Sequence, residues 1–168
     1  TDQQAAVKDA PAETIVVDVP GKSERTMALM AHYDSATDSD GDRARFTTSG
    51  DSYGAADDGY GVATIVETLR ALKAEGRQPE NSLKIVITDA EEIGLVGARN
   101  EMRHHRADYE NVDLVLNLEA RGMSGPAFMF ETSPNNSAVA GYFLSHVKQP
   151  VTALLFGEVS NRIGRAHV

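Results

Sequence analysis

Short apolar runs of strand length alternate with stretches of helical periodicity along this chain of 168 residues. Residues 83–87 form an apolar run broken only by Lys84, which is typical of a buried strand. From Gly59 onward the period changes, and apolar residues follow the spacing of one helix face: Val62, Ile65, Val66, Leu69 and Leu72. A sheet of largely apolar strands must be covered on both faces, and the intervening helices can cover them. The pattern therefore predicts an α/β three-layer sandwich, a mostly parallel mixed sheet with helices on both faces.

The remaining elements follow from the same two periods and from turn residues. We expect strands at residues 14–19, 26–31, 83–87, 112–118 and 127–130. We expect helices from residue 59 until Gly76 and Pro79, at 95–104 and at 137–147. Residues 35–53 are rich in Asp, Ser, Thr and Gly and are expected to form a long surface loop. A chain of this length is predicted to be one domain over residues 1–168.

Composition excludes several function classes. The net charge of -9 argues against a nucleic-acid partner, which favours a basic face. Without cysteine, neither disulfides nor thiolate metal sites are available. No apolar stretch is long enough to span a membrane. The chain starts at Thr1 without a signal-like segment, so we expect a processed or excised piece of a longer protein.

Acidic and histidine side chains gather where the predicted strands end. His32 ends the second strand, Glu91 and Glu92 follow the strand at 83–87, and Glu119 follows the strand at 112–118. Asp57 stands at the start of the helix that a loop connects to His32. Ligands of open α/β sheets bind at the carboxyl edge of the strands, so these side chains are expected to meet there.

One imidazole and several carboxylates, with no sulfur, form a donor set that suits zinc and tolerates manganese or cobalt. A carboxylate could also bridge two ions. One glutamate of the pair Glu91-Glu92 could bind a metal while its neighbour handles a proton.

Each of these residues also has a purely structural interpretation. Asp57-Asp58 could simply cap a helix, with no role in a metal site. Glu91-Glu92 could simply interact with the dipole at the start of the next helix. His32 could be a hydrogen-bonded core histidine, and Glu119 a surface acid at a strand end.

Four segments resemble, in order, the motifs of the di-zinc metallopeptidase family of bacterial leucyl aminopeptidases, aminopeptidase Y and glutamate carboxypeptidase. They are AHYDS at 31–35, GAADDGYG at 54–61, DAEEIGL at 89–95 and LNLEA at 116–120. Residues 117–134 look most like the endoplasmic-reticulum metallopeptidase branch and its bacterial relatives. Each motif is weak by itself, but four in order at compatible spacing are specific.

The resemblance implies a role for each matching residue. His32 and Glu119 match ligands of a first zinc ion, Asp57 matches the carboxylate that bridges two zinc ions, and Glu92 matches a ligand of the second. Glu91 matches the general base that takes a proton from the attacking water.

Two more residues match the surroundings of the metals. Asp34 matches the carboxylate that orients the ligand histidine, and Asp58 follows the bridging aspartate through a peptide bond that is cis in the family.

One ligand of the family is not matched. Its second zinc is completed by a histidine far downstream, whereas the only late histidine here, His167, stands in a different setting, RAHV. We therefore expect a chain that lacks the C-terminal part of the sheet and the last ligand of the second zinc. Such a fragment is expected to bind one metal and to be poorly active or inactive.

The resemblance implies a zinc-dependent exopeptidase that acts on peptides, an aminopeptidase foremost. Two alternatives stay open: a deacylase or dipeptidase of the acetylornithine deacetylase family, which shares the order of acidic and histidine residues, and a non-catalytic homologue used for binding. The resemblance implies a secreted, periplasmic or membrane-anchored protein, and the residues themselves leave the localisation open. The sequence leaves the oligomeric state, the native metal and the side-chain preference open.

Overall fold

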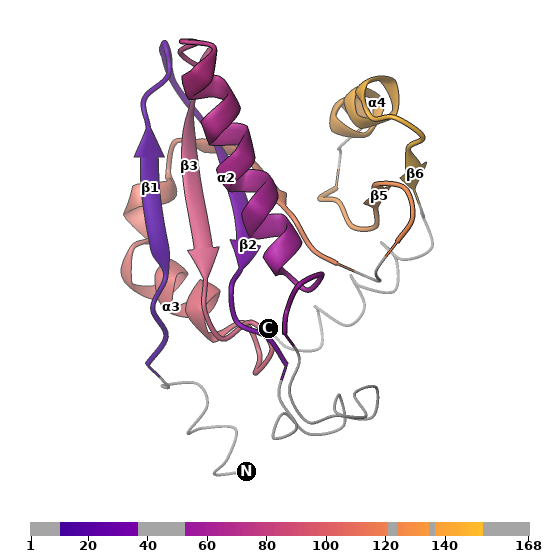
Figure 1. The fold of residues 1–168 in the computed structure, drawn as a ribbon. Coiled ribbons are helices and arrows are strands. Elements are labelled where there is room, and N and C mark those ends of the chain that lie inside the picture. Colours follow the sequence, from indigo (N-terminus) through magenta and orange to yellow (C-terminus); the bar gives the residue numbers. More distant parts are fainter. Residues whose placement is uncertain (1–10, 37–52, 121–123, 135–136, 153–168) are drawn as a thin grey trace. The chain divides into compact units, whose positions relative to one another are not determined.

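The computed structural model describes residues 11–36, 53–120, 124–134 and 137–152 (Figure 1). The chain divides into two compact units, residues 1–123 and residues 124–168. The first unit holds a four-stranded sheet and all seven candidate site residues. His167 lies outside the described residues. That the two units form a single domain stays a prediction.

The sheet of the first unit is mixed and mostly parallel, as predicted. Its strands follow the spatial order β1 (Ile15–Val19), β3 (Asn81–Thr88), β2 (Ser23–His32) and β4 (Val112–Asn117). β2 is parallel to both β3 and β4, whereas β1 is antiparallel to β3. The carboxyl ends of β2, β3 and β4 therefore lie at one edge of the sheet, and polar residues follow each of them.

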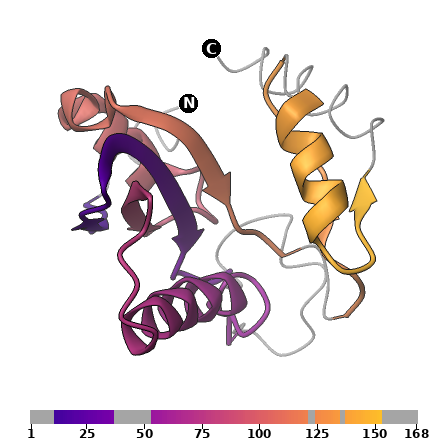
Figure 2. The same cartoon turned by 90° about the horizontal axis from the view of Figure 1, so that it is seen from above.

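Helices lie on both faces of this sheet, which confirms the predicted architecture. Figure 1 and the perpendicular view in Figure 2 place α2 (Gly59–Ala74) on one face and α3 (Val96–His104) on the other. A short 3-10 helix, η2 (Arg106–Tyr109), follows α3 and was not predicted. The apolar face of α2 that the sequence indicated contributes Ile65, which is 1% exposed, to the core.

The core lies between α2 and the two central strands. Alternate residues of β2 and β3 pack there: Leu29, Ala31, Leu83, Ile85 and Ile87. Burial of each large aliphatic side chain stabilises the fold by roughly 1.5–3 kcal/mol. This packing holds the ends of β2 and β3 in a fixed position.

Lys84 interrupts the apolar run of β3 and is nevertheless buried. Its Nζ lies 2.6 Å from Oδ1 of Asp18 on β1 and 5.2 Å from the ring centroid of Tyr109. A buried ammonium requires such partners because desolvating a charge is costly.

β4 is less covered than its apolar sequence suggests. Val115 is 54% exposed and Leu116 is 45% exposed. The reason is its place at the edge of the described sheet, next to β2 only.

The second unit contains a short parallel pair of strands, β5 (Phe128–Met129) and β6 (Val151–Thr152), and the helix α4 (Ser137–His146). The strand predicted at 127–130 is shorter than expected, and the predicted helix at 137–147 is present. β6 was not predicted, because two residues are too few to show a period. Most of the predicted loop at 35–53 lies outside the described residues. Nowhere in the described part of the chain is a helix long and apolar enough for a membrane crossing.

Candidate metal centre

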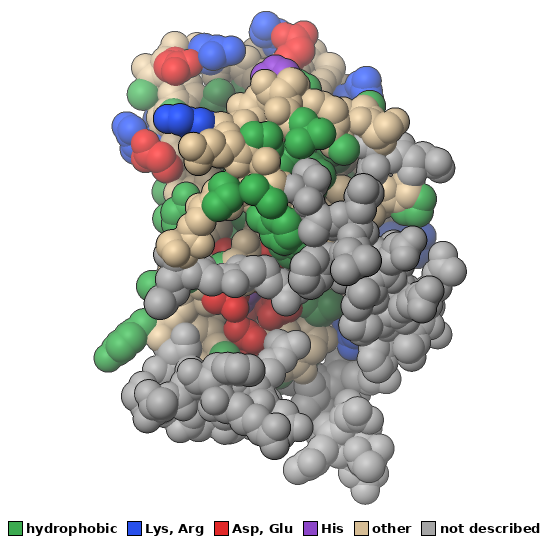
Figure 3. Space-filling model, turned by 90° about the vertical axis from the view of Figure 1, so that its right-hand side faces the viewer, with side chains coloured by type: hydrophobic (Ala, Val, Ile, Leu, Met, Phe, Trp, Pro, Cys, Tyr) green, Lys and Arg blue, Asp and Glu red, His purple; other side chains and the backbone are tan. Residues whose placement is uncertain are grey.

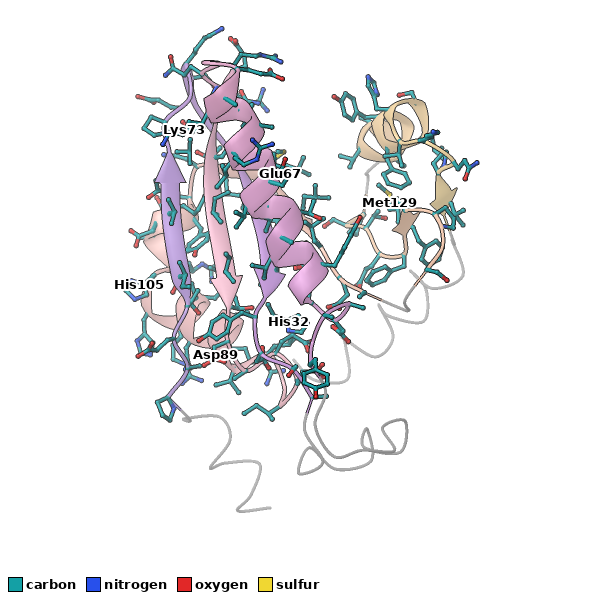
Figure 4. All side chains as sticks on the ribbon, viewed as in Figure 1. His32, Glu67, Lys73, Asp89, His105 and Met129 are labelled. Atoms are coloured by element: carbon teal, nitrogen blue, oxygen red, sulfur yellow. The ribbon has the colours of Figure 1, made fainter. Side chains whose placement is uncertain are left out.

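His32 is the last residue of β2, and its side chain is 3% exposed. Figure 4 shows it at the lower end of the sheet, the end at which Asp89 follows β3. Its Nδ1 lies 3.0 Å from the main-chain oxygen of Asp34, an acceptor, so Nδ1 carries the proton in the neutral ring. Nε2 lies 3.0 Å from Oδ1 of Asp57, so the protonated ring donates there, and loss of that proton leaves the Nε2 lone pair for a metal.

Asp58 explains how Asp57 reaches the histidine. Its carboxylate accepts the amide N–H of Gly61 at 3.0 Å, which makes Asp58 the N-cap of α2. The other oxygen accepts the backbone N–H of His32 at 3.3 Å, so the start of α2 is bound to the end of β2. The peptide bond between Asp57 and Asp58 is cis, as the resemblance implied.

Gly61 is required by this cap. A Cβ at this position would lie 2.4 Å from each oxygen of the Asp58 carboxylate. Glycine allows the carboxylate to approach the helix backbone closely enough to accept its N–H.

Glu91 and Glu92 belong to the turn between β3 and α3. Their backbone N–H groups donate to the two oxygens of Asp34, at 3.0 and 3.1 Å. Gly94 has φ of 115°, a conformation that favours glycine, and closes the turn with a hydrogen bond to the Glu91 carbonyl at 2.9 Å. The pair thus lies at the same edge of the sheet as His32.

Glu119 lies two residues after the end of β4. The N–H of Leu118 donates to the carbonyl of Met30 at 2.8 Å, which continues the pairing with β2 past the end of the strand. Oε1 of Glu119 then lies 3.8 Å from Nε2 of His32 and accepts the amide N–H of Ala120 at 2.8 Å.

Two groups of donor atoms among the described residues could hold a metal ion. One is His32 with Asp57 and Glu119, and the other is His32 with Glu91 and Glu92; within each group the atoms lie within 4.8 Å of one another. Figure 3 shows acidic side chains gathered together on one side of the protein. One imidazole nitrogen and several carboxylate oxygens are donors that fit a metal ion, and zinc stays a prediction.

The carboxylates raise the basicity of the histidine. Burial lowers the pKa of His32, but the hydrogen bonds to Glu119 and Asp57 and the charge of Glu91 outweigh it and raise that pKa to about 10. A bound metal ion would replace this proton as the positive partner of the carboxylates.

The pKa values of the acidic groups in the site are shifted in opposite directions. Burial and the charge of Glu119 raise the pKa of Asp57, and burial raises the pKa of Asp58 to about 6. Burial also acts to raise the pKa of Glu119, but hydrogen bonds with His32 and with the amide of Ala120 hold it below its usual value.

The model of peptidase family M28 matches residues 14–164 of the sequence. The chain belongs to peptidase family M28. The matched range includes all the residues described above that surround His32.

The sequence is also similar to proteins that are named as proteases. The M28 chain is 32% identical over 152 residues to a vacuolar membrane protease of Schizosaccharomyces pombe, a match covering 89% of the chain and 16% of the relative. It is 31% identical over 137 residues to a vacuolar membrane protease of Yarrowia lipolytica, covering 82% of the chain and 12% of the relative. The chain thus spans less than a fifth of the length of these relatives.

Solved structures show the same fold. The LapA aminopeptidase of Legionella pneumophila aligns with a TM-score of 0.59 at 20% identity, covering 90% of this chain and 43% of LapA. LapB from the same organism aligns with a TM-score of 0.59 at 16% identity, covering 90% and 44%.

All seven site residues predicted from the sequence of this M28 chain lie at one edge of the sheet: His32, Asp34, Asp57, Asp58, Glu91, Glu92 and Glu119. Their individual roles stay predictions. Asp57 and Glu92, expected to share the second zinc, do not occur together in either donor group of the described residues. His167 lies outside those residues.

Several contacts at this edge were not predicted. Asp34 contacts the amides of Glu91 and Glu92, and Asp58 contacts the amide of His32. Asp89, which stands in one of the four motifs but was given no role, accepts the amide N–H of Ala90 at 2.8 Å. Aspartate favours such a bond to a neighbouring backbone N–H, but no sequence pattern indicates the long-range ones.

Proposed function

We propose that this chain carries the catalytic centre of a zinc-dependent exopeptidase, an aminopeptidase foremost. The observation that carries the proposal is the convergence of Asp57 and Glu119 on Nε2 of the buried His32. Membership of a peptidase family and the likeness to an aminopeptidase fold support the same reaction class.

In this proposal His32, Asp57 and Glu119 hold the first ion. Asp57 and Glu92 would contribute to a second ion in the complete protein. Bound zinc supplies Lewis acidity, which polarises the scissile carbonyl and makes water easier to deprotonate.

Glu91 is the general base. It takes a proton from the attacking water and passes it to the nitrogen of the leaving amine when the peptide bond breaks. Glu91 suits this role because it lies close enough for its charge to act on His32 and is held at the same edge of the sheet.

The acidity of the site favours a substrate with a positive charge near the scissile bond. A free α-amine is such a group, and nearby carboxylates would bind it more strongly than a blocked N-terminus. This preference is the reason for proposing aminopeptidase over endopeptidase activity. The names of the relatives motivate the further proposal that the complete protein works at a membrane.

The decisive experiment is Glu91→Gln in the complete protein, with hydrolysis of amino-acid anilides and bound metal both measured. Because the amide cannot accept the proton, kcat is expected to fall by about 10²–10⁴-fold. Zinc binding at His32, Asp57 and Glu119 is expected to remain. Glu110→Gln, on the exposed residue after η2, is the matched control and should keep full activity.

Unchanged turnover of Glu91→Gln would remove Glu91 as the base. A wild-type chain that binds no zinc-site metal would favour a non-catalytic homologue used for binding. Hydrolysis of N-acylated amino acids, with none of anilides bearing a free amine, would favour the deacylase alternative.

A further inference from the structure

Asp34 joins two parts of the site that are far apart in the sequence. Its Oδ1 accepts the N–H of Glu91 at 3.0 Å, and its Oδ2 accepts the N–H of Glu92 at 3.1 Å, across 57 and 58 residues. One carboxylate therefore bonds to two consecutive amides, one with each oxygen. Hydrogen bonds to an ionised acceptor are about twice as strong as neutral ones.

We propose that Asp34 is a positioning residue for Glu91 and Glu92, the proposed base and the proposed ligand. This role goes beyond orienting His32, and it rests on the proposed function only for its consequence in catalysis. The side chain of Asp34 is 16% exposed, so water competes little for its oxygens.

The turn that carries the two glutamates has internal hydrogen bonds to its carbonyl groups, whereas the amides of Glu91 and Glu92 donate to Asp34. It lies outside helices and strands, and Ala90, directly before Glu91, has φ of 55°, where a side chain crowds the backbone. The orientation of the Glu91 and Glu92 peptide planes decides where the two side chains leave the backbone. Asp34 fixes both planes by accepting from both amides.

The same carboxylate also faces the histidine, since Oδ1 lies 3.3 Å from Nδ1 of His32. Nδ1 has a second acceptor, the main-chain oxygen of Asp34 at 3.0 Å, which a side-chain substitution leaves in place. Replacing the Asp34 carboxylate should therefore disturb the turn more than the imidazole.

Asp34→Asn separates the two roles. Its amide group keeps one oxygen acceptor and replaces the other with an N–H₂ donor, which cannot accept from a backbone N–H. The matched control is Asp89→Asn at the same edge, because Asp89 bonds the amides of Ala90 and Glu13 and neither glutamate amide.

The first readout is amide hydrogen exchange of the zinc-loaded chain, measured by NMR. In the wild type both glutamate amides should exchange at least about tenfold more slowly than unprotected amides. In Asp34→Asn at least one of them should exchange about tenfold faster or more, corresponding to the loss of one charge-assisted bond. Asp89→Asn should leave both rates unchanged.

The second readout is turnover of the complete protein at saturating zinc. A base displaced by about 1 Å can cost on the order of 10²-fold. We expect Asp34→Asn to lower kcat by about that factor, with KM changed by less than about tenfold. Full recovery of kcat at saturating zinc would show that Asp34 only orients the histidine and would overturn the proposal.

The hydrogen-exchange and turnover measurements test the positioning role of Asp34 and the proposed function separately. Protected glutamate amides with no turnover in the complete protein would contradict the proposed function and leave the positioning role standing. Unprotected glutamate amides in the wild type overturn the positioning role, whether or not the variant folds.

Discussion

Nε2 of His32 lies 3.0 Å from Oδ1 of Asp57, although 25 residues separate them in the chain. The next residue, Asp58, accepts the backbone N–H of the same histidine. Consecutive aspartates thus contact the imidazole and the main chain of one residue. This arrangement assigns a structural role to Asp58 and leaves the Asp57 carboxylate facing the atom that would bind a metal.

Removing the imidazole should remove metal binding. His32 belongs to both donor groups, so we expect His32→Ala to weaken zinc binding by more than about 100-fold. This loss exceeds the effect of removing a residue that only hydrogen-bonds a metal ligand. His146→Ala is the control, because His146 belongs to neither group. Competition titration with a chromogenic chelator measures both, and equal affinity of His32→Ala and wild type would contradict the proposed site.

Zinc affinity should rise with pH. Neighbouring carboxylates outweigh burial and raise the pKa of His32 to about 10, so at neutral pH the metal must displace a proton from the ring. The apparent affinity should then increase by about tenfold per pH unit until that pKa is approached. Calorimetry in buffers of different ionisation enthalpy would count the released proton. Zinc binding without proton release at pH 7 would contradict this account.

Asp58 should make the metal-free chain less stable as pH rises. Burial raises its pKa from 3.8 to about 6, so the folded chain binds the proton more tightly than the unfolded chain. Stability from this group is present below pH 3.8 and is lost as pH rises to about 6, on the order of 2–3 kcal/mol.

The neutral Asp58→Asn keeps an acceptor for the helix cap and lacks this titration. Urea unfolding at pH 4 and pH 7 should show the variant gaining stability relative to wild type as pH rises. A difference in the free energy of unfolding that is constant between these pH values would contradict the assignment.

Gly61→Ala should destabilise the fold even though alanine favours helices. The added Cβ would lie 2.4 Å from both oxygens of Asp58 and would displace the cap, at a cost of about 0.5–2 kcal/mol or more. Gly141→Ala is the matched control within α4, because nothing lies within 4 Å of its added Cβ. That substitution should be neutral or stabilising by up to about 1 kcal/mol. Thermal unfolding followed by circular dichroism would compare them, and a Tm of Gly61→Ala at or above wild type would refute the close contact.

Much of the fold could be predicted from local patterns. The apolar run of β3 and the helical spacing of α2 report directly which side chains are buried, so both elements and the α/β class follow from them. The short strand β6 and the 3-10 helix η2 could not be predicted, because each is too short for a period.

The sequence by itself determined which residues gather at the carboxyl edge of the sheet, because strand ends and motif order are local properties of the chain. Only the tertiary structure decided which of them touch: Asp57 and Glu119 on Nε2 of His32, and Asp34 on the amides of Glu91 and Glu92. It also decided that β1 runs antiparallel to β3 and that β4 lies exposed at the edge of the described sheet. Hydrophobic periodicity records how deeply each residue is buried. Contacts across 25 or 57 residues depend instead on strand order and register, which the packing of the whole sheet sets.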